Sequence, residues 1–137
     1  MRPFTVRIDD AALEDTARRL AATRWLDDRP APPASGATLG FARSLCEHWR
    51  HRFDWRALED RINRHDNVIV DIEGLEIHAL VQRSSRADAV PLLLIHGWPS
   101  SFLEFLDACP ALAEPADEGP AFHVVAPSST TAATPGE

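Results

Sequence analysis

The chain has 137 residues, of which 45% are hydrophobic, and this is enough for a single domain with a real core. Its net charge is −7 and all 14 basic residues are Arg, an acidic balance that argues against binding to the phosphates of nucleic acid. No apolar run approaches the roughly 18 residues needed to cross a bilayer, and the first ten residues lack an apolar core for export, so we expect a cytoplasmic chain without a membrane span.

Residues 1–66 carry a helical pattern. Asp9 or Asp10 can accept hydrogen bonds from the free N–H groups at a helix start. Apolar residues then recur at helical spacing up to Trp25, at Leu13, Ala17, Leu20 and Ala21. The Pro-rich stretch 27–37 cannot continue this helix and predicts an extended break.

Two further helices are predicted after this break. Thr38 can cap the first, whose apolar stripe is Phe41, Leu45, Trp49 and Phe53. Asp54 can start the second, whose buried edge is Trp55, Leu58 and Ile62. Trp25, Trp49 and Trp55 could form a ligand cage, but aromatic residues at helical spacing favour core packing.

Residues 67–82 predict an antiparallel hairpin with one covered face. Apolar residues alternate on both arms, at Val68, Val70 and Ile72 and then at Leu75, Ile77, Ala79 and Val81. Glu73 and Gly74 form the tight turn between the arms. His78 falls on the side opposite the apolar row, where a solvated or hydrogen-bonded role is favoured over catalysis.

The pattern changes at residue 90. The run "VPLLLIHG" is typical of a strand covered on both faces, as in a parallel sheet. Ser101 to Glu104 match a capping box, and a helical stripe follows at Phe102, Phe105, Leu106 and Cys109. The segment "AFHVVAP" is a second buried strand, so the order strand, helix, strand predicts a right-handed crossover and an α/β fold. Cys46 and Cys109 are isolated thiols, expected to be half-buried and to form neither a disulfide nor a metal site.

Four residues mark the junction between the first of these strands and the helix. Backbone N–H groups at such a junction suit developing negative charge. Gly97 has no Cβ and allows a close approach, and Pro99 fixes one dihedral and permits a cis bond after Trp98. His96 could be a general base, but a His at a strand end is more often a brace for its loop.

In this setting the sequence resembles the N-terminal region of the microsomal and juvenile-hormone-type epoxide hydrolases, which have the α/β-hydrolase fold. The resemblance runs from Pro3 to Ser128, through "PFTVRIDDAALEDTARRLAATRW", "HWRHRFDWRALEDRINRHDN", "IEGLEIHALVQRS", "PLLLIHGWPSSFLEF" and "FHVVAPS". It implies a helical segment over 1–66 that packs on the lid of the hydrolase domain. It also implies the first part of the hydrolase core over 67–128, an antiparallel hairpin followed by a parallel strand-helix-strand unit.

The resemblance also implies a reaction. In that family a carboxylate attacks an epoxide carbon to give an ester, lid tyrosines protonate the opening oxygen, and a His paired with an acid activates water to release the diol. The residues His96, Gly97, Trp98 and Pro99 would form part of the oxyanion hole and pocket, with the Trp98 N–H as donor. The substrates would be bulky apolar or aromatic epoxides, in detoxification or aromatic hydrocarbon catabolism, and no metal or organic cofactor is implied.

After Ser128 the family pattern is lost, and the tail 129–137 is expected to be disordered. The resemblance places the nucleophile turn and the catalytic His and acid later in the chain, and the sequence contains no Tyr for the lid. We therefore assign no catalytic residue to this chain and expect an N-terminal fragment, such as a frameshift product, that is inactive alone.

Two other functions remain open. The chain could be the non-catalytic half of a split enzyme, binding a complementary C-terminal chain, or self-associating, through an exposed sheet edge. It could instead hydrolyse esters with His96 and Asp66 or Asp71. We disfavour this activity because no Ser sits in a nucleophile elbow and nothing in the sequence brings these groups together.

Overall fold

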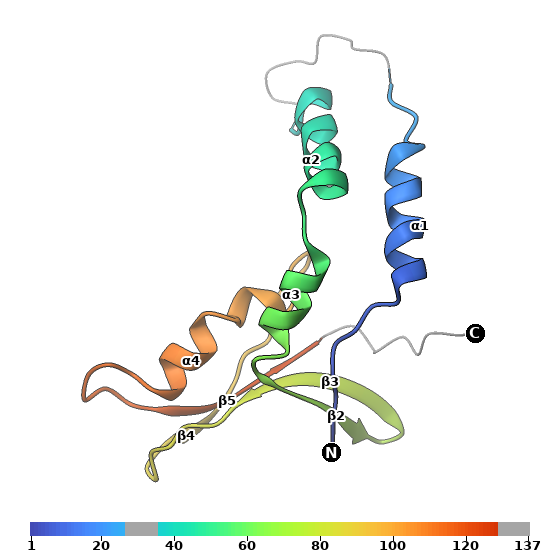
Figure 1. The fold of residues 1–137 in the computed structure, drawn as a ribbon. Coiled ribbons are helices and arrows are strands. Elements are labelled where there is room, and N and C mark those ends of the chain that lie inside the picture. Colours follow the sequence, from blue (N-terminus) through green and yellow to red (C-terminus); the bar gives the residue numbers. More distant parts are fainter. Residues whose placement is uncertain (27–35, 129–137) are drawn as a thin grey trace. The chain divides into compact units, whose positions relative to one another are not determined.

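The computed structural model describes residues 1–26 and 36–128, which fall into two compact units (Figure 1). The helical unit is Arg7–Arg56, and the sheet unit combines Met1–Val6 with the chain from Ala57 onward. Most of the predicted Pro-rich break and the whole of the predicted tail 129–137 lie outside the described residues. The three-part division at 66 and 128 remains a prediction.

The helical unit contains α1 (Asp10–Ala21) and α2 (Leu39–His51). The predicted cap of α2 is confirmed, because the Thr38 hydroxyl accepts a hydrogen bond from the Phe41 N–H at 3.2 Å. The predicted side-chain cap of α1 by Asp9 is wrong: its carboxylate makes no cap bond, and its backbone carbonyl accepts from the Ala12 N–H at 3.0 Å. The Asp10 carboxylate is instead paired with Arg56.

The prediction that the tryptophans of this region are core residues is wrong for two of them. Trp25 is 37% exposed and Trp49 is 41% exposed. Neither α1 nor α2 contains a buried residue, because these two helices contact each other only along a narrow strip and leave the apolar stripe of α2 open. Trp55 is half-buried and packs edge-on against Phe53, with ring centroids 5.2 Å apart.

The sheet unit holds five strands, β1 (Arg2–Pro3), β2 (Asp66–Ile72), β3 (Leu75–Gln82), β4 (Val90–Leu93) and β5 (Phe122–Pro127), in the order β1-β2-β3-β5-β4. The predicted hairpin is confirmed: β2 and β3 are antiparallel, and both turn residues have positive φ, 56° at Glu73 and 86° at Gly74. The predicted parallel pair is also confirmed, with Leu92 opposite Val124 and Leu93 opposite Val125. β1, which pairs with the outer side of β2, was not predicted from the sequence.

The segment that joins β4 to β5 differs from the single helix expected. A short 3₁₀ helix, η1 (Phe102–Phe105), is followed by α4 (Ala108–Ala113). Pro110 lies in the first turn of α4, where its missing N–H is tolerated, whereas in one continuous helix from residue 102 it would lie in the interior and clash. The Ser101 hydroxyl caps η1 by accepting from the Leu103 N–H at 3.4 Å.

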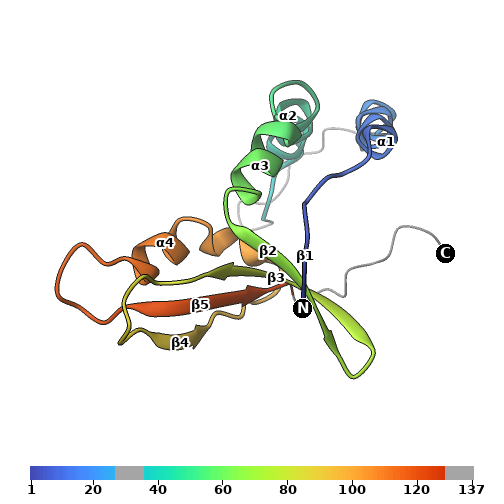
Figure 2. The same cartoon turned by 60° about the horizontal axis from the view of Figure 1, so that its bottom comes forward.

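The core lies on one face of the sheet, under η1 and α4 (Figure 2). Leu80, Val124 and Cys109 are its fully buried side chains. α3 (Trp55–Ile62) adds Ile62 to this core, as predicted, and Asp54 supports its first turn by accepting from the Arg56 N–H at 2.9 Å.

Two expectations about burial are corrected by this arrangement. The hairpin is covered on both faces away from its turn: Val68 and Ala79 of the predicted apolar row are buried, but so are His78 and Leu80 on the opposite face, and Ile72 and Leu75 beside the turn are exposed. β4 is not covered on both faces: it lies at the end of the strand order, and Leu93 is 59% exposed. Alternation alone could not reveal this, because both faces of these strands carry apolar residues.

Candidate functional site

The four residues singled out from the sequence, His96 to Pro99, form a tight turn beyond the carboxyl end of β4. The Leu94 N–H donates to the Val125 carbonyl at 2.9 Å and carries the parallel pairing one residue past the strand. The chain then turns, with the Ser100 N–H donating to the Gly97 carbonyl at 2.8 Å and with a cis bond between Trp98 and Pro99. The turn leads directly into η1, so the strand-turn-helix junction expected from the sequence is present.

The Trp98 amide has the surroundings that an oxyanion donor needs. It lies outside every helix, between a parallel strand and η1. Among the described residues no hydrogen bond uses the Trp98 N–H, so this donor has no protein acceptor there. The Trp98 side chain is 96% exposed, and its ring is therefore available as a wall for a ligand rather than committed to the core.

Gly97 is not required by the packing of the described residues. A Cβ added at this position would meet no atom within 4 Å, and its φ is not in the left-handed region. The expected close approach therefore concerns a ligand or a segment outside the described residues.

His96 is half-buried, and its Nδ1 lies 3.5 Å from the Gly97 carbonyl oxygen, a distance at which any hydrogen bond is weak. The two carboxylates considered as its partners, Asp66 and Asp71, belong to β2. β3 and β5 separate β2 from β4, and three strand spacings amount to about 14 Å. This separation disfavours ester hydrolysis by His96 with Asp66 or Asp71.

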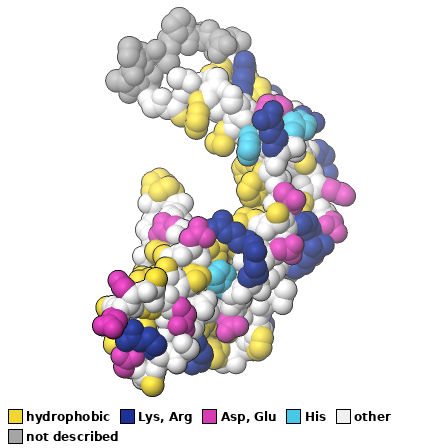
Figure 3. Space-filling view, turned by 60° about the vertical axis from the view of Figure 1, so that its left-hand side comes forward, with side chains coloured by type: hydrophobic (Ala, Val, Ile, Leu, Met, Phe, Trp, Pro, Cys, Tyr) yellow, Lys and Arg dark blue, Asp and Glu magenta, His cyan; other side chains and the backbone are white. Residues whose placement is uncertain are grey.

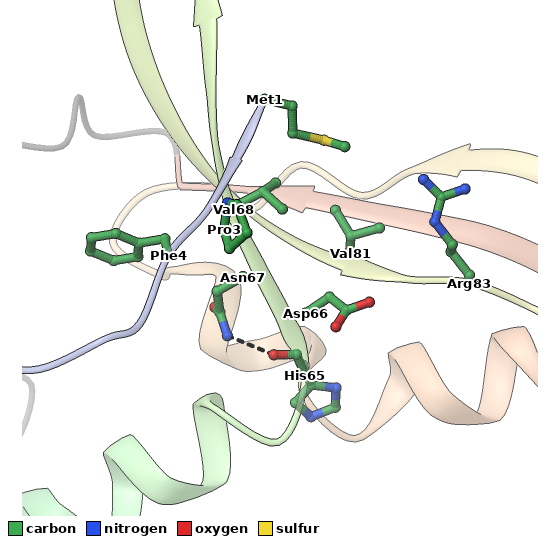
Figure 4. Close-up of a pocket in the computed structure, with 9 residues that line it drawn as sticks. All are labelled: Met1, Pro3, Phe4, His65, Asp66, Asn67, Val68, Val81 and Arg83. Carbon is green, nitrogen blue, oxygen red and sulfur yellow. Dashed lines mark hydrogen bonds between the residues drawn. The ribbon is translucent and has the colours of Figure 1, made fainter.

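An open pocket of about 350 Å³ lies beside the N-terminal segment of the sheet unit (Figure 4). It is lined by residues of the N-terminal segment and of the β2 and β3 ends, among them Phe4, Asp66, Asn67 and Arg83. None of the four residues of the Trp98 turn lines this pocket, and none lines the larger open pocket of about 550 Å³ beside α2. We locate the candidate site at the turn, because there the free donor and the open approach coincide.

A buried polar network was not predicted from the sequence. His78 is 6% exposed and its ring contacts the Ser128 hydroxyl and the Asn67 side chain. The expectation of a hydrogen-bonded histidine is therefore correct and that of a solvated one is not. The signal available beforehand was register, because a two-residue turn at Glu73 and Gly74 places positions 67 and 78 on the same face of the hairpin.

Neither a metal cluster nor a spanning helix is found in the described part of the chain. Within residues 1–26 and 36–128, no three His, Cys, Asp or Glu side chains lie together as metal ligands would. No helix in these ranges combines the length and the apolar composition that a bilayer crossing requires. The face drawn in Figure 3 carries Arg side chains interspersed with Asp and Glu, and both cysteines are free thiols, with Cys109 buried.

Comparison with known sequences identifies one family. The family profile described as "Epoxide hydrolase N terminus" matches residues 1–105. A protein of Stigmatella aurantiaca described as a putative epoxide hydrolase is 43% identical over 131 residues, which cover 92% of this chain and 30% of that protein. Epoxide hydrolase 1 of Sus scrofa is 32% identical over 93% of this chain and 30% of its own length.

Comparison with solved structures points to the same family. The epoxide hydrolase of Aspergillus niger superimposes with a TM-score of 0.73 at 36% identity, covering 93% of this chain and 34% of that one. The juvenile hormone epoxide hydrolase of the silkworm Bombyx mori superimposes with a TM-score of 0.75 at 27% identity, covering 93% and 35%. The chain thus spans about a third of the length of the relatives that it matches.

Proposed function

The chain belongs to the epoxide hydrolase family, whose N-terminal region it matches, and from this premise we propose that its Trp98 turn is the oxyanion-binding corner of an epoxide-hydrolysing site. The fold agrees with this premise, because the α/β-hydrolase core expected from the sequence is also the fold of the matching structures. The observation that carries the proposal is the Trp98 N–H, which has no acceptor among the described residues and lies at the end of a parallel strand.

The donor acts on the second half of the proposed reaction. A carboxylate opens the epoxide and becomes an ester, and water attacks the ester carbonyl to give a tetrahedral oxyanion. A fixed N–H aimed at that oxygen stabilises the charge without reorganising, and removing one such donor typically lowers kcat by about 10² to 10³. Gly97 lets the oxygen approach the backbone, and the exposed Trp98 ring forms one apolar wall of the pocket.

The other participants in this reaction are assigned outside the described residues. We assign the attacking carboxylate, the acids that protonate the epoxide oxygen and the His that activates water to the part of the family that this chain does not match. The substrate class is an apolar or aromatic epoxide, and the cellular role is detoxification or aromatic catabolism in the cytoplasm. The reaction uses carboxylate, imidazole and water.

A hybrid enzyme tests the role of the turn. Residues 1–128 of this chain would replace the matched segment of the Stigmatella aurantiaca protein, and diol formation from styrene oxide would be measured. Replacing Trp98 by its α-hydroxy acid turns the Gly97–Trp98 amide into an ester, which removes the N–H and also weakens the Gly97 carbonyl as the acceptor for the Ser100 N–H. We expect kcat to fall by about 10² with little change in stability. An unchanged kcat in an active hybrid would refute the assignment of Trp98 as the donor.

The exposed edge of the sheet favours a second candidate function, binding of a complementary α/β-hydrolase chain. Among the described residues no strand pairs with the outer side of β4. Val90, Leu93 and Ile95 along this edge are 53%, 59% and 65% exposed, and apolar strand edges favour pairing with another chain. Mixing the intact chain with the unmatched C-terminal part of the Stigmatella aurantiaca protein tests this function, because stable co-elution with diol formation would support it. Separate elution with no activity would count against it.

A further inference from the structure

The His78 side chain occupies the meeting point of four segments in the sheet unit. Its ring lies edge-on between two aromatic rings, with centroid distances of 5.4 Å to Phe4 and 5.0 Å to Phe102. One ring nitrogen lies 3.0 Å from Asn67 Oδ1 on β2, and the other lies 2.8 Å from Ser128 Oγ, just past β5. An imidazole on β3 therefore joins the N-terminal segment, β2, the start of η1 and the exit of β5.

The hydrogen bonds of Asn67 determine which nitrogen of this ring carries the proton. The Asn67 amide group donates from Nδ2 to two backbone carbonyls, that of Ile62 at 3.0 Å and that of His65 at 2.9 Å. Figure 4 draws the bond to His65. Because both donors are engaged there, the atom that faces His78 is the acceptor Oδ1, and His78 Nε2 must donate to it. Nδ1 is then unprotonated and accepts from the Ser128 hydroxyl.

We propose that His78 is a positioning residue for the Trp98 turn, and that it holds both sides of the turn only as the neutral Nε2–H imidazole. This inference rests on the proposed function of the turn. On one side, Phe102 is the first residue of η1 and follows the turn directly. On the other side, Ser128 donates its N–H to the His78 carbonyl at 2.8 Å and so fixes the end of β5. β5 in turn holds the end of β4, because the Val125 carbonyl accepts from the Leu94 N–H just before the turn.

Protonation of His78 at low pH should weaken its contacts with the segments on both sides of the Trp98 turn. A proton added at Nδ1 turns the acceptor into a donor, which the Ser128 hydroxyl can meet only by rotating its own proton away. Burial lowers the pKa of His78, because a charged ring would be held among apolar neighbours. The folded chain therefore binds this proton less readily than the unfolded chain, so the stabilisation is complete above pH 6.5 and decreases as the pH falls below that value.

The charged groups of the surrounding elements do not change this expectation. Arg2 of β1 is paired with Glu76 of β3 at 3.0 Å. Glu104 of η1 accepts from the Ser100 hydroxyl. Glu59 of α3 is buried and has its own interaction, and no charged group contributes to the lowered pKa of His78.

The test uses the intact chain labelled with ¹⁵N and needs no substrate. Two-bond ¹H–¹⁵N spectra at pH 7.5 report the tautomer of His78, and amide spectra from pH 7.5 to 4.5 follow Ser128, Phe102 and Trp98. We expect an Nε2–H ring at pH 7.5. We also expect the three amides to titrate with the ring and the Ser128 amide to exchange about tenfold faster in acid, beyond the intrinsic effect of pH.

Two variants separate positioning from simple packing. Ser128→Ala removes the donor to Nδ1, so the pKa of His78 should rise and the Trp98 amide should titrate at a correspondingly higher pH. His123→Gln is the matched control: His123 lies on β5, accepts from the Ser84 N–H at 3.2 Å and contacts neither Ser128 nor Asn67 in the described structure, so the coupled titration should persist. The inference would be overturned if His78 were found as the Nδ1–H tautomer or as a mixture of tautomers. It would also be overturned if the chemical shift of the Trp98 amide did not change as His78 titrates. Either result would leave the oxyanion role of Trp98 standing, because that role is measured separately as kcat of the hybrid.

Discussion

Substitution of Gly97 tests whether this glycine is required for activity and not for folding. An Ala side chain at Gly97 would enter open space, and its backbone does not require a positive φ. Gly97→Ala should therefore stabilise the chain by about 0.4 to 1 kcal/mol, because Ala loses less conformational entropy on folding. Gly74 is the control, since its φ is 86° and an Ala there must adopt a left-handed conformation, at a cost of about 1 kcal/mol.

Urea unfolding followed by circular dichroism measures both variants, and the hybrid enzyme measures their activity. We expect Gly97→Ala to raise the free energy of unfolding and Gly74→Ala to lower it. We also expect kcat/KM to fall at least about tenfold for Gly97→Ala, because its methyl group blocks the approach of the reacting oxygen to the backbone. Gly74→Ala should keep its kcat/KM, because it lies at the tip of the hairpin. A destabilised Gly97→Ala variant would show that the turn is packed more tightly than its geometry indicates. A fully active one would refute the role of Gly97 in substrate approach.

Three further outcomes follow from burial. Trp98→Ala should change the free energy of unfolding by less than about 0.5 kcal/mol, because the ring is exposed, and a loss above about 1.5 kcal/mol would contradict this. Leu80→Ala should cost about 2 to 5 kcal/mol in the same urea experiment, since it empties a fully buried site, and a cost below about 1 kcal/mol would show that the core can collapse around it. Leu93→Lys should shift any self-association in sedimentation velocity toward the monomer, by placing a charge on the exposed edge of β4, and unchanged association would place the contact elsewhere.

Local chemistry made part of the fold predictable. The Thr38 cap and the hairpin turn at Glu73 and Gly74 each follow from residues close in sequence. The turn from His96 to Pro99 was located for the same reason, because an apolar run that ends in His-Gly-Trp-Pro marks a strand end wherever the strand lies in the sheet. The parallel pairing of Leu92 with Val124 follows from the order strand, helix, strand. The split between η1 and α4 follows from the position of Pro110, although periodicity alone indicated one helix.

Other features required the tertiary structure, because they depend on which elements meet. The strand order leaves β4 at an edge, and this makes Leu93 exposed although its neighbours in sequence look like core. The ring of His78 is buried and its tautomer fixed only because Asn67, Ser128, Phe4 and Phe102 converge on it from separate segments. A sequence specifies the conformational preference of each short segment, but burial and hydrogen-bond partners are properties of pairs of segments, and these are determined only when the chain has packed.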